Sequence, residues 1–215
     1  WICRDELALI QQLGFDVHQL ARKLAGQQHG AAPNLSGQGE VERLQGQSPP
    51  AVLPPKSSSG FDVEDFVRRS IHEIWNWRLL NKVDDYYTPN YLCSTAGNRN
   101  LYGRGDFKAY ILSLLAAFPD AAMHVDHICW LGNEAEGYRV ATRWTLQGTH
   151  QGPGSYGEPT GKRIWLMGIT HQLIQAGKFV REWTVFDEFA LLKQLYAPNS
   201  PDSSHSSSAL HKEGL

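Results

Sequence analysis

The sequence predicts an α+β domain in which helices cover one face of a curved antiparallel sheet. Two observations lead to this class. Residues 62–118 carry apolar side chains at helical spacing, whereas residues 122–186 contain four long segments rich in β-forming residues. Helices followed by a meander of strands are typical of a sheet whose helices are segregated to one face. We expect such a sheet to enclose a conical cavity.

The helical half begins at Asp62, which can cap a helix through the free N–H groups of the first turn. Apolar side chains then recur at helical spacing over residues 63–75, and the pattern predicts a helix that runs to about Asn81. Asp106 is expected to cap a second helix. Phe118-Pro119-Asp120 ends that helix, because proline disfavours the helical conformation in the residue before it.

The strand half consists of segments bounded by turn residues. Residues 132–134 and 175–178 are typical of hairpin connections. A final helix is expected over residues 188–195, with Asp187 as its cap. The predicted strands are residues 122–131, 138–148, 162–174 and 179–186.

A repeat defines the expected domain organisation. Residues 1–13 align without a gap on residues 183–195, with seven of the thirteen positions identical. Duplicated segments usually reflect duplicated structural units. We therefore interpret residues 1–24 as the C-terminal remnant of a preceding repeat and residues 61–197 as one whole domain. Residues 25–60 and 198–215 are rich in Gly, Pro and Ser, which predicts a disordered linker and a disordered tail.

Composition excludes several classes of protein. The net charge is −2 with both signs interspersed, so no nucleic-acid partner is predicted. No apolar run approaches the length of a membrane span. The three cysteines form neither a disulfide framework nor a zinc spacing, which predicts a cytoplasmic protein without a metal. His124, Asp126 and His127 leave a non-haem iron site open as an alternative.

The chain contains a set of short motifs, which are Phe118-Pro119-Asp120, Arg143-Trp144, Gly148-Thr149-His150-Gln151-Gly152, Pro159-Thr160-Gly161-Lys162-Arg163, Gly177-Lys178-Phe179-Val180-Arg181-Glu182-Trp183, and Asp187 with Gln194-Leu195. In this order and spacing the set resembles the SnoaL-like (polyketide-cyclase-like) branch of the nuclear-transport-factor-2-like superfamily. The resemblance implies a cone-shaped α+β barrel with a deep apolar pocket. It also implies ring closure by intramolecular aldol condensation without a cofactor, in which a pocket Asp acts as acid/base, helped by a His.

The candidate catalytic residues follow from this resemblance and from one departure. The family Asp stands nine residues after Gly161, where this chain has Thr170 followed by His171. Thr cannot serve as a base at neutral pH, so the family mechanism does not carry over intact. His150 matches the family His and is the first candidate for proton transfer or carbonyl polarisation. Thr170, His171 and Asp126 follow as orienting groups. A structural alternative is open for each histidine. His150 would be a loop residue hydrogen-bonded to nearby backbone, and His171 would lie on the outer face of the sheet.

Aromatic residues are numerous and suit a pocket for a flat ligand. Glu182 is interpreted as a solvated strand residue rather than a pocket carboxylate. The leading functional hypothesis is a domain that binds a small apolar or aromatic carbonyl compound, with cofactor-free cyclase or isomerase chemistry. The alternative is a non-catalytic ligand-binding or dimerisation module, paired as a homodimer or with the preceding repeat. The candidate substrate-binding residues are Trp75, Trp144, Tyr156, Trp165 and Trp183.

Overall fold

The computed structural model describes residues 3–25, 53 and 60–198. The predicted linker and tail lie almost entirely outside these residues, as does Trp1 of the repeat. The helices are α1 (Glu6–Gln12), α2 (Val17–Ala25), α4 (Val63–Ile71), α5 (Val83–Tyr86), α6 (Gly103–Ala117) and α7 (Glu188–Tyr196). The strands are β1 (Tyr87–Thr95), β2 (Arg99–Tyr102), β3 (Ala122–Asn133), β4 (Gly137–Thr149), β5 (Arg163–Gln175) and β6 (Lys178–Phe186).

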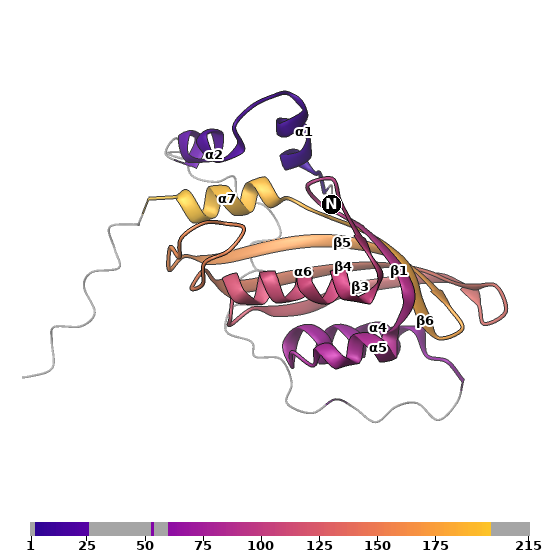
Figure 1. The fold of residues 1–215 in the computed structure, drawn as a ribbon. Coiled ribbons are helices and arrows are strands. Elements are labelled where there is room, and N and C mark those ends of the chain that lie inside the picture. Colours follow the sequence, from indigo (N-terminus) through magenta and orange to yellow (C-terminus); the bar gives the residue numbers. More distant parts are fainter. Residues whose placement is uncertain (1–2, 26–52, 54–59, 199–215) are drawn as a thin grey trace, which may run out of the picture.

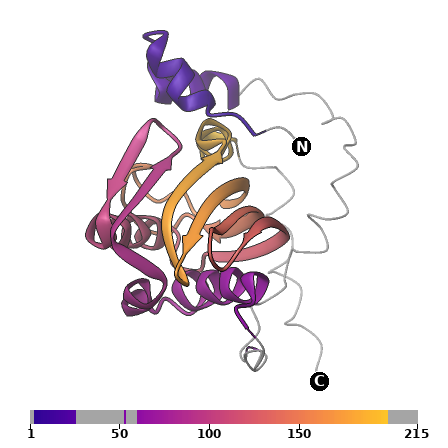
Figure 2. The ribbon, with the colours of Figure 1, turned by 90° about the vertical axis from the view of Figure 1, so that its right-hand side faces the viewer.

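The strands form one curved sheet in the order β2-β1-β6-β5-β4-β3 (Figures 1 and 2). Helices α4, α5 and α6 lie along one side of the sheet, and α7 runs along another part of it with α1 and α2 outside (Figure 1). The predicted α+β class and the antiparallel meander from β3 to β6 are confirmed. The sheet is mixed, because β1 pairs with β6 in parallel, and it does not close into a barrel.

The first predicted helix begins as expected and ends earlier than expected. The Asp62 carboxylate accepts a hydrogen bond from the Asp65 backbone N–H at 3.0 Å, so Asp62 is the cap. The α-helix ends at Ile71 and continues as one π-helical turn over His72–Asn76. Arg78 then adopts a φ of 60°, which no right-handed helix can contain. The prediction of a helix to Asn81 is therefore wrong.

Strands β1 and β2 were not predicted from the sequence. Pro89 and Asn90 fall inside β1, and both residue types are depleted in strands. The β1–β6 register is irregular between Tyr87 and Leu92, the stretch that contains Pro89, which lacks the N–H that a ladder needs. The partner strand β6 is also remote in sequence. No local pattern could therefore indicate this parallel pair.

The N-terminal segment repeats the cap geometry of the last helix. Asp5 accepts from the Ala8 N–H at 3.0 Å, and Asp187 accepts from the Ala190 N–H at 2.7 Å. These are matching positions of the repeat. The other Asp5 oxygen accepts from the N–H of Gly97, in the β1–β2 turn, at 2.8 Å. The segment is thus tied to the domain by a cap residue.

The two matched helices differ in what they bury. Leu9 and Leu13 of the N-terminal segment are 56% and 63% exposed. Their counterparts Leu191 and Leu195 are 1% and 2% exposed, because α7 lies against the core. The N-terminal segment therefore presents to solvent the positions that α7 uses for packing. The tandem repeat itself stays a prediction.

Candidate functional site

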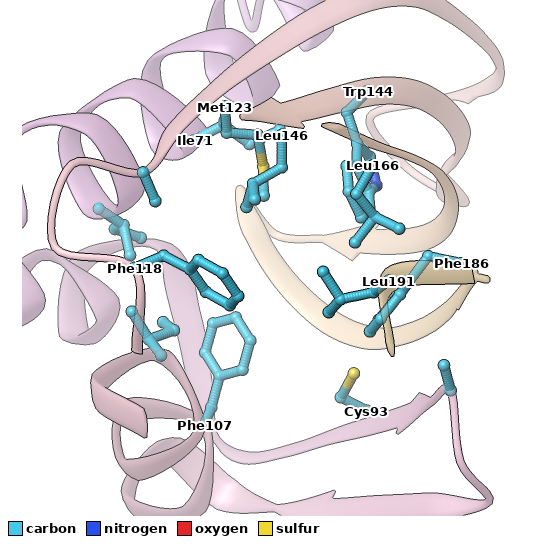
Figure 3. Packing of buried hydrophobic residues seen from close by; sticks show 14 of the residues in the cluster. Ile71, Cys93, Phe107, Phe118, Met123, Trp144, Leu146, Leu166, Phe186 and Leu191 are labelled. Atoms are coloured by element: carbon cyan, nitrogen blue, oxygen red, sulfur yellow. The ribbon is translucent and has the colours of Figure 1, made fainter. Parts of the chain in front are cut away.

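An apolar cavity lies between the sheet and the helices. Its volume is about 80 Å³, several times the roughly 10–15 Å³ that one water needs. In Figure 3 the lining side chains surround one common space, with Ile71 and Phe107 from the helices and Leu146, Leu166 and Phe186 from the sheet. The sheet's concave face and the helices therefore enclose a small apolar cavity.

Glu182 on β6 is the carboxylate of this cavity, and its side chain is almost fully buried. Its Oε2 accepts a hydrogen bond from the Tyr91 hydroxyl at 2.7 Å. Its Oε1 accepts from Gln172 Nε2 at 3.1 Å and from the Tyr87 hydroxyl at 3.5 Å. Gln172 is itself fixed, because its Oε1 accepts from the Thr142 hydroxyl at 3.0 Å. The carboxylate is held by neutral donors, and no described Lys or Arg pairs with it.

This environment changes the acidity of Glu182. Burial raises the pKa of Glu182 from an ordinary value of 4.5 to about 7, and the bonds from Tyr91, Gln172 and Tyr87 oppose that rise. On β1, the neighbouring Cys93 thiol has a pKa raised to about 12, by burial first and by the Glu182 charge second. Glu182 can therefore exchange a proton near neutral pH, whereas the Cys93 thiol stays protonated.

The raised pKa has a consequence for stability. Between pH 4.5 and 7 the folded state holds a proton on Glu182 that the unfolded state releases. The stabilisation is present below pH 4.5 and is lost as the pH rises through 7. The gap corresponds to roughly 3 kcal/mol, at about 1.4 kcal/mol per pH unit. We expect the unfolding free energy of the wild type, relative to Glu182→Gln, to fall by this amount between pH 4.5 and 8. Urea denaturation at a series of pH values measures it, and parallel pH curves for the two proteins would contradict it.

Two threonine hydroxyls stand next to the carboxylate in the cavity. The indole N–H of Trp144 donates to Thr170 Oγ1 at 2.9 Å, and Thr170 Oγ1 lies 3.0 Å from Thr184 Oγ1. Thr184 follows Glu182 by two residues on β6, so both side chains point to the same face. Because Trp144 occupies one acceptor site of Thr170, each hydroxyl proton can be given to the other threonine or to a ligand.

A second buried carboxylate supports another wall of the cavity. Glu188, at the first position of α7, accepts from the Tyr156 hydroxyl at 3.0 Å and from Arg99 Nη2 at 2.6 Å. Tyr156 lines the cavity, and burial followed by the charge of Glu188 raises its pKa well above 10. Tyr156 is therefore a protonated phenol held in place by an ion pair behind it.

The predicted substrate-binding residues divide into two groups. Trp75, Trp144 and Tyr156 line the cavity, and their role in substrate binding stays a prediction. Trp165 and Trp183 do not, because each alternates along its strand with cavity-lining neighbours and points to the opposite face. Trp183 lies on the outer sheet surface, 42% exposed, with the Arg181 guanidinium 4.7 Å from its ring centroid. The structure therefore does not place Trp165 and Trp183 in the lining of this cavity.

His150 is fully buried outside the cavity lining. Its Nδ1 accepts from the Thr160 backbone N–H at 3.3 Å, and its ring lies 5.3 Å from that of Phe118, which does line the cavity. Its backbone bonds to Gly161 and Lys162 close the loop that carries Tyr156. Burial lowers the pKa of His150, so the ring is held neutral. The structure thus places His150 one layer behind the wall, as a loop-fixing residue.

Of the other candidate catalytic residues, only Thr170 reaches the cavity. His171 is exposed on the outer sheet face, opposite to Thr170. Asp126 sits at the β3 bulge and accepts from Thr145 at 2.7 Å, also on the outer face. The structure therefore does not place His171 and Asp126 in the cavity. Within residues 3–25 and 60–198, no three His, Cys, Asp or Glu side chains form a group that could hold a metal ion.

The sequence did not lead us to predict Glu182 as a cavity residue, although the alternation of residues along β6 indicated this position. Along β6, Glu182, Thr184 and Phe186 occupy alternate positions, so a buried Phe186 places Glu182 on the inner face. Glutamate is almost never fully buried unless paired, and this favoured the solvated interpretation. Two of its three hydrogen-bond donors, Tyr87 and Tyr91, come from β1, the strand that the sequence did not reveal.

A curved sheet with helices on one face and an apolar cavity between them defines a protein of the NTF2-like class. Among the helices of the described residues, none combines the length and the apolar character needed to cross a membrane. Residues 65–195 match the family model of the SnoaL-like polyketide cyclases, so the chain belongs to that family. A comparison with curated proteins found no match.

Solved structures share this fold at low sequence identity. A protein from Jannaschia sp. CCS1, provisionally described as a SnoaL-like polyketide cyclase, is 16% identical with a TM-score of 0.55, over 67% of this chain and 100% of its own. AclR of Streptomyces galilaeus, provisionally described as a hydroxylase, is 24% identical with a TM-score of 0.52, over 61% and 93%. IdmH of Streptomyces antibioticus, provisionally described as a polyketide cyclase, is 22% identical with a TM-score of 0.52, over 61% and 96%. These similarities concern the fold alone.

Proposed function

We propose that the protein binds a compact, largely apolar carbonyl compound in the cavity. We further propose that it catalyses cofactor-free proton transfer on that compound, of the aldol cyclase or isomerase type. The observation that carries the proposal is a cavity with apolar walls and a few convergent buried polar groups, which is the usual composition of a small-molecule site. Apolar walls supply affinity, and the hydroxyl and carboxyl groups orient a carbonyl.

The cavity volume limits the ligand. The volume of about 80 Å³ is roughly half of the 150 Å³ that holds one benzene ring. A ketone of one or two rings therefore requires lining side chains to move. Trp75, Leu114 and Leu115 are lining residues that remain partly exposed. A ligand is therefore proposed to enter at the edge formed by α6 and the turn that contains Trp75.

Ligand-dependent stabilisation tests the binding step. A bound ligand raises the apparent stability by mass action, by about 2.7 kcal/mol at a hundredfold excess over Kd. We expect 2-indanone or 2-tetralone to raise the melting temperature of the full chain more than indane or tetralin, which lack the carbonyl. Leu114→Trp should reduce this rise, because the indole fills the cavity edge. Leu112→Trp is the matched control, because Leu112 is 54% exposed on the same helix.

The alternative function is a pairing module without catalysis. The exposed Leu9 and Leu13, at positions that α7 buries, favour a segment that packs on another domain of this kind. Absence of a temperature rise with every ketone would contradict the binding proposal and support the pairing module.

We also propose a cytoplasmic location. Cys3, Cys93 and Cys129 are all free thiols, which suits a reducing compartment. Cell fractionation is the direct test.

A further inference from the structure

The position of the family acid/base residue and the position of Glu182 are close in this sheet. Thr170 pairs with Thr184 across β5 and β6, and Gln172 pairs with Glu182 in the next same-face position. Glu182 therefore lies on the neighbouring strand β6, two residues from Thr184, which is the residue paired with Thr170. Both residues line the same cavity.

The spacing along β6 fits a carbonyl group with its neighbouring C–H. Same-face residues on a strand are about 6.6 Å apart. This separation leaves room for a carbonyl oxygen near Thr184 and an adjacent carbon near Glu182, each at a hydrogen-bond distance of about 3 Å. The hydroxyls of Thr170 and Thr184 are donors for the oxygen, and the Glu182 carboxylate is the acceptor for the proton.

We propose that Glu182 is the general base of this cavity, in place of the family Asp, for ketones with an acidic C–H beside the carbonyl. The inference rests on the proposed function. The C–H bond breaks, an O–H bond forms on Glu182, and the electron pair moves to the carbonyl oxygen, which gives an enolate. The proton then returns from Glu182 to the same or another carbon, so neither oxidant nor cofactor is consumed. Tyr91 and Gln172 are positioning residues, since they fix the two carboxylate oxygens.

Exchange of the ketone's C–H protons for solvent deuterium tests this assignment, and it does not require the natural substrate to be known. The full chain is mixed in D₂O with 2-tetralone, and loss of the proton signals next to the carbonyl is followed by NMR. We expect the wild type to accelerate exchange and Glu182→Gln to lose about a hundredfold or more of that acceleration, as for removal of a general base. Glu134→Gln is the control, because Glu134 is exposed in the β3–β4 turn.

A second pair of variants separates the donor role from a structural one. Thr184→Val should slow the exchange of the ketone protons. Thr184→Ser keeps the hydroxyl and should exchange them at close to the wild-type rate. Thermal shift with 2-tetralone is measured for every variant. If the ketone binds and either the wild type gives no acceleration or Glu182→Gln keeps it, the assignment of Glu182 is rejected while the binding proposal stands. If no ketone binds, the proposed function fails and the assignment fails with it.

Discussion

Replacing Gly168 with alanine is expected to lower the free energy of unfolding by about 2–6 kcal/mol and to displace Trp144 from its place in the cavity wall. Gly168 is the β5 partner of Trp144 on β4, and a Cβ at Gly168 would lie 2.1 Å from the indole ring. The ring must move, which costs about 1–3 kcal/mol for overpacking. It also breaks the bond to Thr170, and a buried polar group without its partner costs about 1–3 kcal/mol more.

Urea denaturation measures the loss, with Gly105→Ala as the control. Gly105 lies in α6 with open space around its Cβ position, so alanine there should be neutral or stabilise by up to about 1 kcal/mol. Trp144→Phe removes the ring atoms that meet the new Cβ. The double variant should therefore lose less than the sum of the two single variants. Additive losses would show that the indole does not determine the need for glycine.

The second large effect is expected for Glu188→Ala. The substitution removes the partner of both Arg99 and Tyr156, and it leaves the Arg99 charge beside a cavity wall. Removing one partner of a buried pair costs about 3–5 kcal/mol. Arg99 keeps 38% of its side-chain exposure, and solvent screening places the expected loss at the lower end, about 3 kcal/mol. Chemical denaturation is the measurement.

The repeat supplies a matched control for this variant. Glu6 is the first residue of α1, as Glu188 is of α7, but Glu6 is partly exposed. Glu6→Ala should change stability by no more than about 0.5 kcal/mol. Adding Arg99→Ala to Glu188→Ala should recover part of the loss, because it removes the uncompensated charge. An equal loss for Glu6→Ala and Glu188→Ala would contradict the role of the pair.

Local patterns were sufficient for most elements of the fold. The four strands from β3 to β6 lie within two residues of their predicted ends, because turn residues bound each of them. The caps Asp62 and Asp187 also follow from local hydrogen bonding. The sequence could not reveal β1, since its parallel partner is remote and Pro89 interrupts its pattern. The left-handed Arg78 that ends the first helical segment has no local signature either.

The site was harder to predict for a related reason. Which face of a strand is wet depends on the whole sheet, so Thr170 and His171 could not be separated by sequence alone. Glu182 is retained inside only because donors from β1 and β5 satisfy it. His150 matched a family motif, yet its contacts belong to the loop that it closes. Family motifs indicated the fold more reliably than they indicated which side chains meet in the cavity.

The Asp5 carboxylate caps α1 with one oxygen and holds the Gly97 N–H with the other. Gly97 lies two residues before Arg99, whose ion pair with Glu188 supports Tyr156. The N-terminal segment is thus connected, through the β1–β2 turn, to the side chains that support the cavity wall. A chain that begins at residue 61 would lack the Asp5 carboxylate and would therefore leave the Gly97 N–H without this acceptor.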